Sequence, residues 1–156
     1  NPYLCARSIK RKFKNILRKM IAFNNEIEFT LDNQDDLVIW ITQTIDKEGF
    51  KLGELNYIFC SDEQLLEKNI EFLNHDTYTD IISFDYTMGK LVSGDIFISI
   101  DRITDNSKTF NTSFQDELNR VMIHGVLHYC GYIDKTDDDK SLMRSKEDYY
   151  LSLRKF

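Results

Sequence analysis

The chain has 156 residues, of which 42% are hydrophobic and 29% are charged. One proline and six glycines argue against long disordered linkers, and no apolar run approaches the about 20 residues of a transmembrane helix. Three widely spaced cysteines (Cys5, Cys60 and Cys130) do not make the even set of a disulfide framework. These features predict one globular domain that does not bind membranes and that works in the reducing cytoplasm.

The net charge of −6 conceals an asymmetry. Residues 1–19 carry seven basic and no acidic side chains, which leaves residues 20–156 with 13 basic and 26 acidic ones. Nucleic-acid affinity comes largely from neutralised phosphates. If the partner is a nucleic acid, we therefore expect its contact with this acidic body to be local, or to be helped by a metal and by the basic segment 1–19.

The first methionine is Met20, so residues 1–19 are interpreted either as a segment upstream of the native start or as a basic arm. Apolar side chains recur in this segment at the spacing of one helix face: Ile9, Phe13, Ile16, Leu17 and Met20. A basic amphipathic helix of this kind lies on a membrane or on RNA, or packs on the body. The chain thus divides into a basic N-terminal extension, 1–19, and a functional domain, 20–156.

Strand and helix signals alternate along residues 20–156. Apolar patterns predict strands at 21–31, 55–60, 81–84 and 96–100, and helices at 35–46 and 103–110. Three further helices are predicted by capping residues: Ser61 with Gln64 for a helix to Phe72, Ser113 with Asp116 for one to Cys130, and Thr136 for one to Leu153. This order predicts a single compact α+β domain with a small mixed β-sheet packed with helices.

Two of the three histidines are spaced as metal ligands. His124 and His128 are four residues apart on the predicted helix, so both imidazoles project from one side. Gly131 follows where a helix favours a residue with positive φ, and the chain can then bring Asp134 back toward them. This spacing is that of the zincin motif H-E-x-x-H-x-x-G-x-x-H with Asp as the third ligand. It predicts a metal-binding helix; a hydrogen-bonded histidine pair beside a surface aspartate is the alternative.

Gly125 decides between hydrolases. Metallopeptidases place a glutamate directly after the first histidine as the general base. This chain has Gly125 there, so a peptidase loses its proton acceptor.

The segment from His124 to Asp134 resembles the signature of the YbeY family of metal-dependent endoribonucleases, H-G-x-L-H-L-x-G-Y-D-H. The segment from Asn69 to Phe84 and the Gly94-Asp95-Ile96 tripeptide also resemble that family. The resemblance covers roughly residues 20–156.

The resemblance implies hydrolytic cleavage of single-stranded RNA in rRNA maturation and ribosome quality control, with the ribosomal small subunit or its proteins as partners. It also implies one zinc-like ion held by His124, His128 and Asp134. The family usually has histidine at the third position, so nickel and manganese stay open beside zinc. A non-catalytic ribosome-assembly factor with a structural metal is the alternative function.

A second departure from the family concerns phosphate binding. Leu73 stands where the resemblance implies an arginine that acts on phosphate. His75 is a candidate catalytic residue that donates to phosphate or moves a proton, or else an ordinary loop histidine. The other candidate cations are Arg102, Arg120 and Lys135.

Several remaining residues are open to two interpretations. Asp76, Thr79 and Asp80 either line the cleft or make turns. Five aromatic residues could stack on bases, although most are expected in the core: Phe72, Tyr78, Phe84, Tyr86 and Tyr132. Cys130 is expected to point away from the metal as a buried structural thiol.

Overall fold

The computed structural model describes residues 2–75 and 77–156. Within these ranges the elements follow one another as α1 (Pro2–Met20), β1 (Ile21–Asn25), α2 (Gln34–Lys47), β2 (Lys51–Cys60), α3 (Asp62–Leu73), β3 (Ile81–Asp85), β4 (Leu91–Ser99), α4 (Ile100–Thr109), α5 (Phe114–Tyr129) and α6 (Asp137–Ser152). No helix in the described part of the chain has the length and apolar character needed to cross a membrane.

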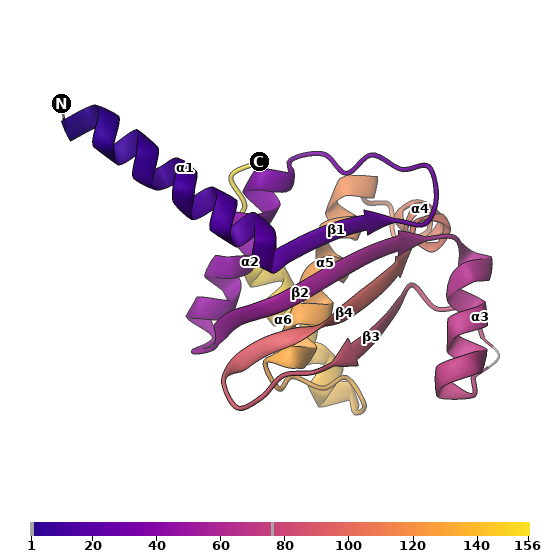
Figure 1. Cartoon of the computed structure of the whole chain (residues 1–156). Coiled ribbons are helices and arrows are strands. Elements are labelled where there is room, and N and C mark those ends of the chain that lie inside the picture. The colour runs from indigo at the N-terminus through magenta and orange to yellow at the C-terminus, as the bar shows by residue number, and fades with distance from the viewer. Residues whose placement is uncertain (1, 76) are drawn as a thin grey trace.

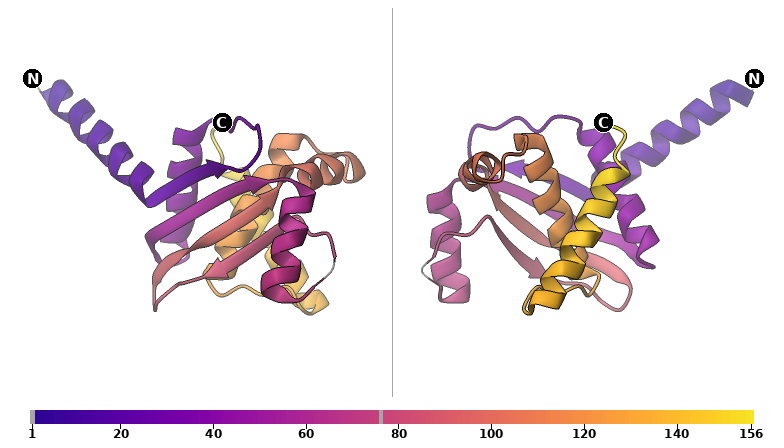
Figure 2. Two further views of the ribbon diagram at one scale, coloured as in Figure 1. Left: turned by 45° about the vertical axis from the view of Figure 1, so that its right-hand side comes forward. Right: turned by 180° about the vertical axis from the view of Figure 1, so that it is seen from behind.

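The four strands form one mixed sheet in the order β1-β2-β4-β3. Strands β1, β2 and β4 are parallel, and β3 pairs antiparallel with β4 at the edge. Helices α2, α5 and α6 lie on one side of the sheet (Figure 1), and the view from behind shows α6 outside α5 (Figure 2). The α+β domain with a small mixed sheet that the sequence predicts is therefore confirmed.

The core lies between the sheet and α5. Ten of the sixteen α5 residues are buried, and they pack on alternate side chains of the strands, such as Ile96 and Ile98. A Cβ atom on Gly125 would lie 2.9 Å from Ile96 Cδ1, so glycine allows α5 to approach the sheet closely. Helix α3 covers one end of the opposite face, where Leu65 packs with Cys60 and Ile82.

The capping residues act as predicted. Ser61 and Gln64 form a complete capping box on α3, and the hydroxyl of Ser113 accepts from Asp116 N at the start of α5. The first predicted strand is too long, because β1 ends at Asn25. Its register pairs Asn25 with Phe59, one residue before β2 ends, so no partner remains for residues 27–31.

Helix α1 projects away from the body (Figure 1). Its C-terminal end packs on the body through buried Leu17 and half-buried Met20, and Arg18 pairs with Asp35 at 2.7 Å. The other members of its apolar stripe, Ile9, Phe13 and Ile16, are exposed.

Candidate metal centre

Two imidazoles and one carboxylate converge at the C-terminal end of α5. His124 Nε2 lies 2.9 Å from His128 Nε2, because residues four apart share one helix face. Gly131 follows the helix with a φ of 96°, which reverses the chain. Asp134 Oδ2 thereby lies 3.3 Å from His124 Nε2 and 3.5 Å from His128 Nε2.

The outer ring nitrogens fix the tautomer of each histidine. His128 Nδ1 lies 2.9 Å from the carbonyl oxygen of Tyr132, which only accepts, so this nitrogen carries the proton. His124 Nδ1 donates in the same way to Glu147 Oε2 at 2.8 Å. When the imidazoles are neutral, both Nε2 atoms therefore present lone pairs toward the Asp134 carboxylate. These two nitrogens and the carboxylate oxygen all face one point with lone pairs, as the ligands of a metal cation do.

The spacing of these atoms fits a tetrahedral ion. Metal–ligand bonds of about 2.0–2.2 Å at tetrahedral angles place neighbouring ligand atoms about 3.4 Å apart. The three distances in the structure are 2.9, 3.3 and 3.5 Å. Among the described residues, His124, His128 and Asp134 are the group of three that could hold a metal ion.

Glu147 on α6 supports His124 from behind. Its side chain is only 7% exposed, and its Oε1 accepts from Arg120 Nη1 at 3.1 Å. Arg120 also pairs with Asp148 at 2.7 Å. Burial alone lowers the pKa of His124, but the Glu147 hydrogen bond and the charges of Glu147, Asp134 and Asp80 together raise it.

A second network supports His128. The hydroxyl of Tyr132 donates to Glu48 Oε2 at 2.8 Å, which anchors the residue whose carbonyl orients His128. Glu48 also accepts from the Tyr150 hydroxyl and, at 3.4 Å, from Lys146. Burial raises the pKa of Glu48, but these hydrogen bonds outweigh it and lower the pKa overall.

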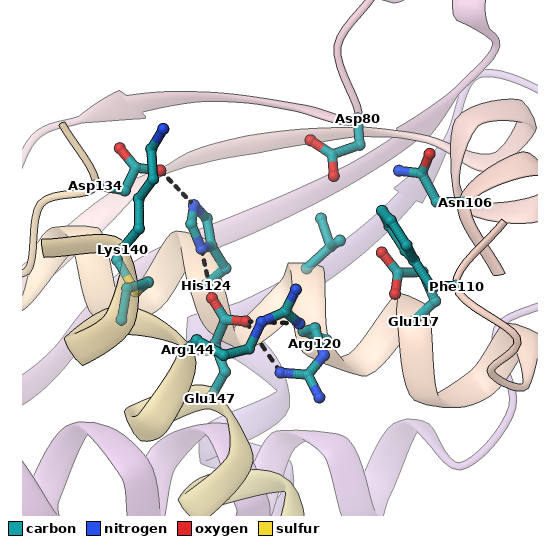
Figure 3. A pocket seen from close by; sticks show the side chains of 12 residues that line it. Asp80, Asn106, Phe110, Glu117, Arg120, His124, Asp134, Lys140, Arg144 and Glu147 are labelled. Carbon is teal, nitrogen blue, oxygen red and sulfur yellow. Dashed lines mark hydrogen bonds and ion pairs between the residues drawn. The ribbon is translucent and has the colours of Figure 1, made fainter. Parts of the chain in front are cut away.

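A cavity of about 390 Å³ opens beside His124 (Figure 3). It is lined by His124 and Asp134, by the carboxylates Asp80, Glu117 and Glu147, by the cations Arg120, Lys140 and Arg144, and by Asn106, Phe110, Val121 and Met143. Burial, followed by the charge of Asp80, raises the pKa of Glu117. Burial also raises the pKa of Asp80. The cavity therefore combines a candidate metal site, basic side chains and two carboxyl groups that hold protons more tightly than usual.

The structure places the predicted residues unevenly around this cavity. Asp80 and Arg120 line it. Thr79 is half-buried at the end of the loop before β3, and Asp76 lies outside the described residues. His75 is exposed in the loop after α3 and is not among the described lining residues.

Two of the candidate cations lie elsewhere. Arg102 pairs with Asp62 at 2.9 Å, and Lys135 is exposed; neither is among the described lining residues of the cavity. Leu73 is 43% exposed on α3, also apart from the cavity lining.

Sequence reasoning missed Glu117, Lys140, Arg144 and Glu147. Glu117 lies seven residues before His124 on the same face of α5, and this spacing could have identified it from the sequence. The α6 residues have no fixed spacing from the histidines.

The expectation that most of the five aromatic residues lie in the core is wrong. Phe72, Tyr78 and Tyr86 are exposed. The ring of Phe72 packs edge-on against that of Phe84, with 5.6 Å between their centroids. Because α3 lies at the end of the sheet, no described element covers the other side of the Phe72 ring. Cys130 is half-buried rather than buried, and burial raises the pKa of its thiol to about 12.

Comparisons with known proteins agree on one family. The family model described as "Endoribonuclease YbeY" matches residues 9–154. The endoribonuclease YbeY of Flavobacterium johnsoniae is 58% identical over 134 residues, which cover 86% of this chain and 96% of that protein. The Cytophaga hutchinsonii protein of the same name is 50% identical over 135 residues, 86% of this chain and 94% of its own. The solution structure of TM1509 from Thermotoga maritima is similar with a TM-score of 0.64 at 28% identity, covering 85% of this chain and 87% of its own.

Proposed function

The chain belongs to the endoribonuclease YbeY family, and from this premise we propose that His124, His128 and Asp134 hold the metal ion of its RNA-cleaving site. The protein is a metal-dependent endoribonuclease of rRNA maturation, a hydrolase that acts on phosphodiester bonds. The observation that carries the ligand assignment is the convergence of two lone-pair nitrogens on one carboxylate oxygen. Their opposite ring nitrogens both donate to fixed acceptors.

Zinc is the ion that this ligand set favours. Two imidazoles and one carboxylate would supply three protein ligands, the number that catalytic zinc sites use. Nickel and manganese are the alternatives, since a carboxylate ligand is harder than an imidazole. When bound, the ion supplies Lewis-acid polarisation of the phosphodiester and of the attacking water.

The side chains around the ligands have separate tasks. Glu147 and the Tyr132 carbonyl hold the neutral rings of both histidines in the tautomer with the proton on Nδ1, which leaves the Nε2 atoms correctly aimed for a ligand bond. Asp80 and Glu117 hold or accept a proton at their carboxylate oxygens, because burial raises the pKa of both in the direction that acid–base work at neutral pH needs. They replace the glutamate that is absent at Gly125.

Single-stranded RNA is the proposed substrate, and the small ribosomal subunit the proposed setting. Residues 20–156 are proposed as the nuclease domain and residues 1–19 as a basic extension to it. The role of His75 as a donor to phosphate stays a prediction. Because His75 is exposed on the loop five residues before Asp80, it would meet RNA outside the cavity.

The test combines metal analysis with cleavage of a labelled single-stranded RNA, with and without a chelator. The wild-type protein is expected to bind one ion per chain and to lose cleavage when chelated. His124→Ala is expected to lose both the ion and the cleavage, because one of the three ligands is gone. His75→Ala is the control for metal content alone, since it removes the remaining histidine at an exposed position and should retain the ion.

Three outcomes would contradict parts of this proposal. Equal cleavage by wild type and His124→Ala would reject the ligand assignment. Bound metal without cleavage would favour the ribosome-assembly factor. A strong loss of cleavage in His75→Ala, with the ion retained, would move the proton or phosphate role to that residue.

A further inference from the structure

Two basic side chains of α6 line the cavity and make no side-chain hydrogen bond with the described part of the chain. Lys140 and Arg144 are four residues apart, so they share one face of the helix. Arg144 Nη1 lies 3.7 Å from Glu147 Oε1, beyond the about 2.7–3.2 Å of a hydrogen bond, and its side chain is 55% exposed. Within the described part of the chain, no carboxylate oxygen lies within 4.0 Å of Lys140 Nζ.

The third cation of the cavity is already engaged. Arg120 binds Glu147 at 3.1 Å and Asp148 at 2.7 Å, and its side chain is largely buried. Its guanidinium therefore holds the carboxylate that supports His124. Within residues 2–75 and 77–156, Arg144 and Lys140 are the cavity cations whose side chains make no hydrogen bond.

We propose that Arg144 and Lys140 bind the phosphate backbone of the RNA strand beside the candidate metal centre. This inference rests on the proposed function and extends it to residues outside the metal ligands. A single carboxylate, Glu147, separates Arg144 from the His124 ring, so a phosphate held by Arg144 lies next to the ligands (Figure 3). The planar guanidinium matches two phosphate oxygens at once, and the lysine adds a point charge.

The charge distribution explains why these contacts matter. Residues 20–156 carry 26 acidic side chains against 13 basic ones, so RNA gains little from the overall field. Leu73 is exposed on α3, apart from the cavity lining, and supplies no cation. The free cations of α6 therefore provide positive charge where the strand must come close to the metal ligands.

A purely structural role for Arg144 is the competing explanation. Its contact with Glu147 is an i,i+3 pair on one helix. A pair with its charges 3.7 Å apart and an exposed arginine stabilises a helix little, and it does not explain why Lys140 lines the same cavity with no ion pair among the described residues. A structural pair would change stability, whereas a phosphate contact would change the salt dependence of RNA binding.

The test measures binding of a short fluorescent single-stranded RNA by anisotropy, with the metal-loaded protein, from about 50 to about 200 mM salt. RNA integrity is checked on a gel after each reading, and cleavage is measured separately as KM and kcat. The variants are Arg144→Gln, Lys140→Gln and Arg144→Lys. Lys155→Gln is the matched control, because it removes one exposed positive charge beyond the far end of α6.

Arg144→Gln and Lys140→Gln are each expected to weaken RNA binding about tenfold and to reduce the salt slope by about 0.7. Arg144→Lys should keep the slope but lose part of the affinity. The metal content and the urea midpoint should match those of Lys155→Gln. Affinities and slopes equal to those of the control would overturn the inference, as would wild-type protein that binds no RNA. RNA binding that depends on Arg144 without any cleavage would retain the inference and reject the proposed catalytic site.

Discussion

Glu147→Gln should weaken metal binding although Glu147 is not a proposed ligand. Glu147 Oε2 accepts from His124 Nδ1 at 2.8 Å, and the carboxylate side chain is 7% exposed. Loss of such a support typically costs 10- to 100-fold in metal affinity. Because water screens this buried pair poorly, we expect about 30- to 100-fold, which corresponds to about 2.0–2.7 kcal/mol.

The assay is competition for zinc against a chromophoric chelator, with Asp148→Asn as the control. Asp148 shares Arg120 with Glu147 but makes no hydrogen bond or ion pair with His124, so the control removes the same charge and leaves the imidazole supported. Its affinity should stay within about threefold of wild type. Equal losses in Glu147→Gln and Asp148→Asn would refute the reasoning, since they would show a general electrostatic effect.

The same substitution has a pH signature in the metal-free protein. The pKa of His124 is raised despite its burial, through Glu147 first. A raised histidine pKa stabilises the fold below the ordinary value of about 6.5, and this contribution disappears as pH rises through the folded-state pKa. Glu147→Gln should therefore lower the free energy of unfolding more at about pH 5.5 than at about pH 9. A loss independent of pH would contradict the assigned pair.

Three further substitutions test the surroundings of the site. Gly125→Ala should cost about 1–3 kcal/mol in urea unfolding, because its Cβ would lie 2.9 Å from Ile96 Cδ1; an unchanged midpoint would show that the sheet yields easily. Burial raises the pKa of Glu117, so the contribution of its protonated carboxyl group to the stability of the fold is lost as pH rises through the folded-state pKa. Glu117→Gln should therefore stabilise the protein at about pH 8 but not at about pH 4. Tyr132→Phe removes the 2.8 Å hydrogen bond to Glu48 and should lower the free energy of unfolding by about 1 kcal/mol. The zinc affinity should stay within about twofold, because the backbone carbonyl that orients His128 remains. A large loss of zinc affinity would assign the hydroxyl a direct part in orienting His128.

The sequence was sufficient for features that depend on local spacing. The capping residues Ser61 and Ser113 mark the starts of α3 and α5, and Gly131 adopts the positive φ that its place after a helix predicts. His124, His128 and Asp134 converge because they lie within eleven consecutive residues. Local geometry thus brings the proposed ligands together before any tertiary contact is considered.

Features that depend on packing between distant segments could not be predicted in this way. Glu147 reaches His124 from a different helix, 23 residues later, and nothing in its neighbours distinguishes it from other acidic residues of α6. The strand predicted for residues 21–31 failed for a similar reason. Phe29 and Leu31 do point into the core, but β2 ends too early to pair with them.

The proposed ligands and the residues that support them are synthesised at different times. During synthesis, the segment that ends at Asp134 is complete before α6 exists, and only a short loop must close to gather its three side chains. Glu147 and the cavity cations Lys140 and Arg144 arrive later, on α6. A growing or truncated chain would therefore carry the proposed ligands without their support or their proposed phosphate contacts, and full metal affinity and nuclease activity would belong only to the finished molecule.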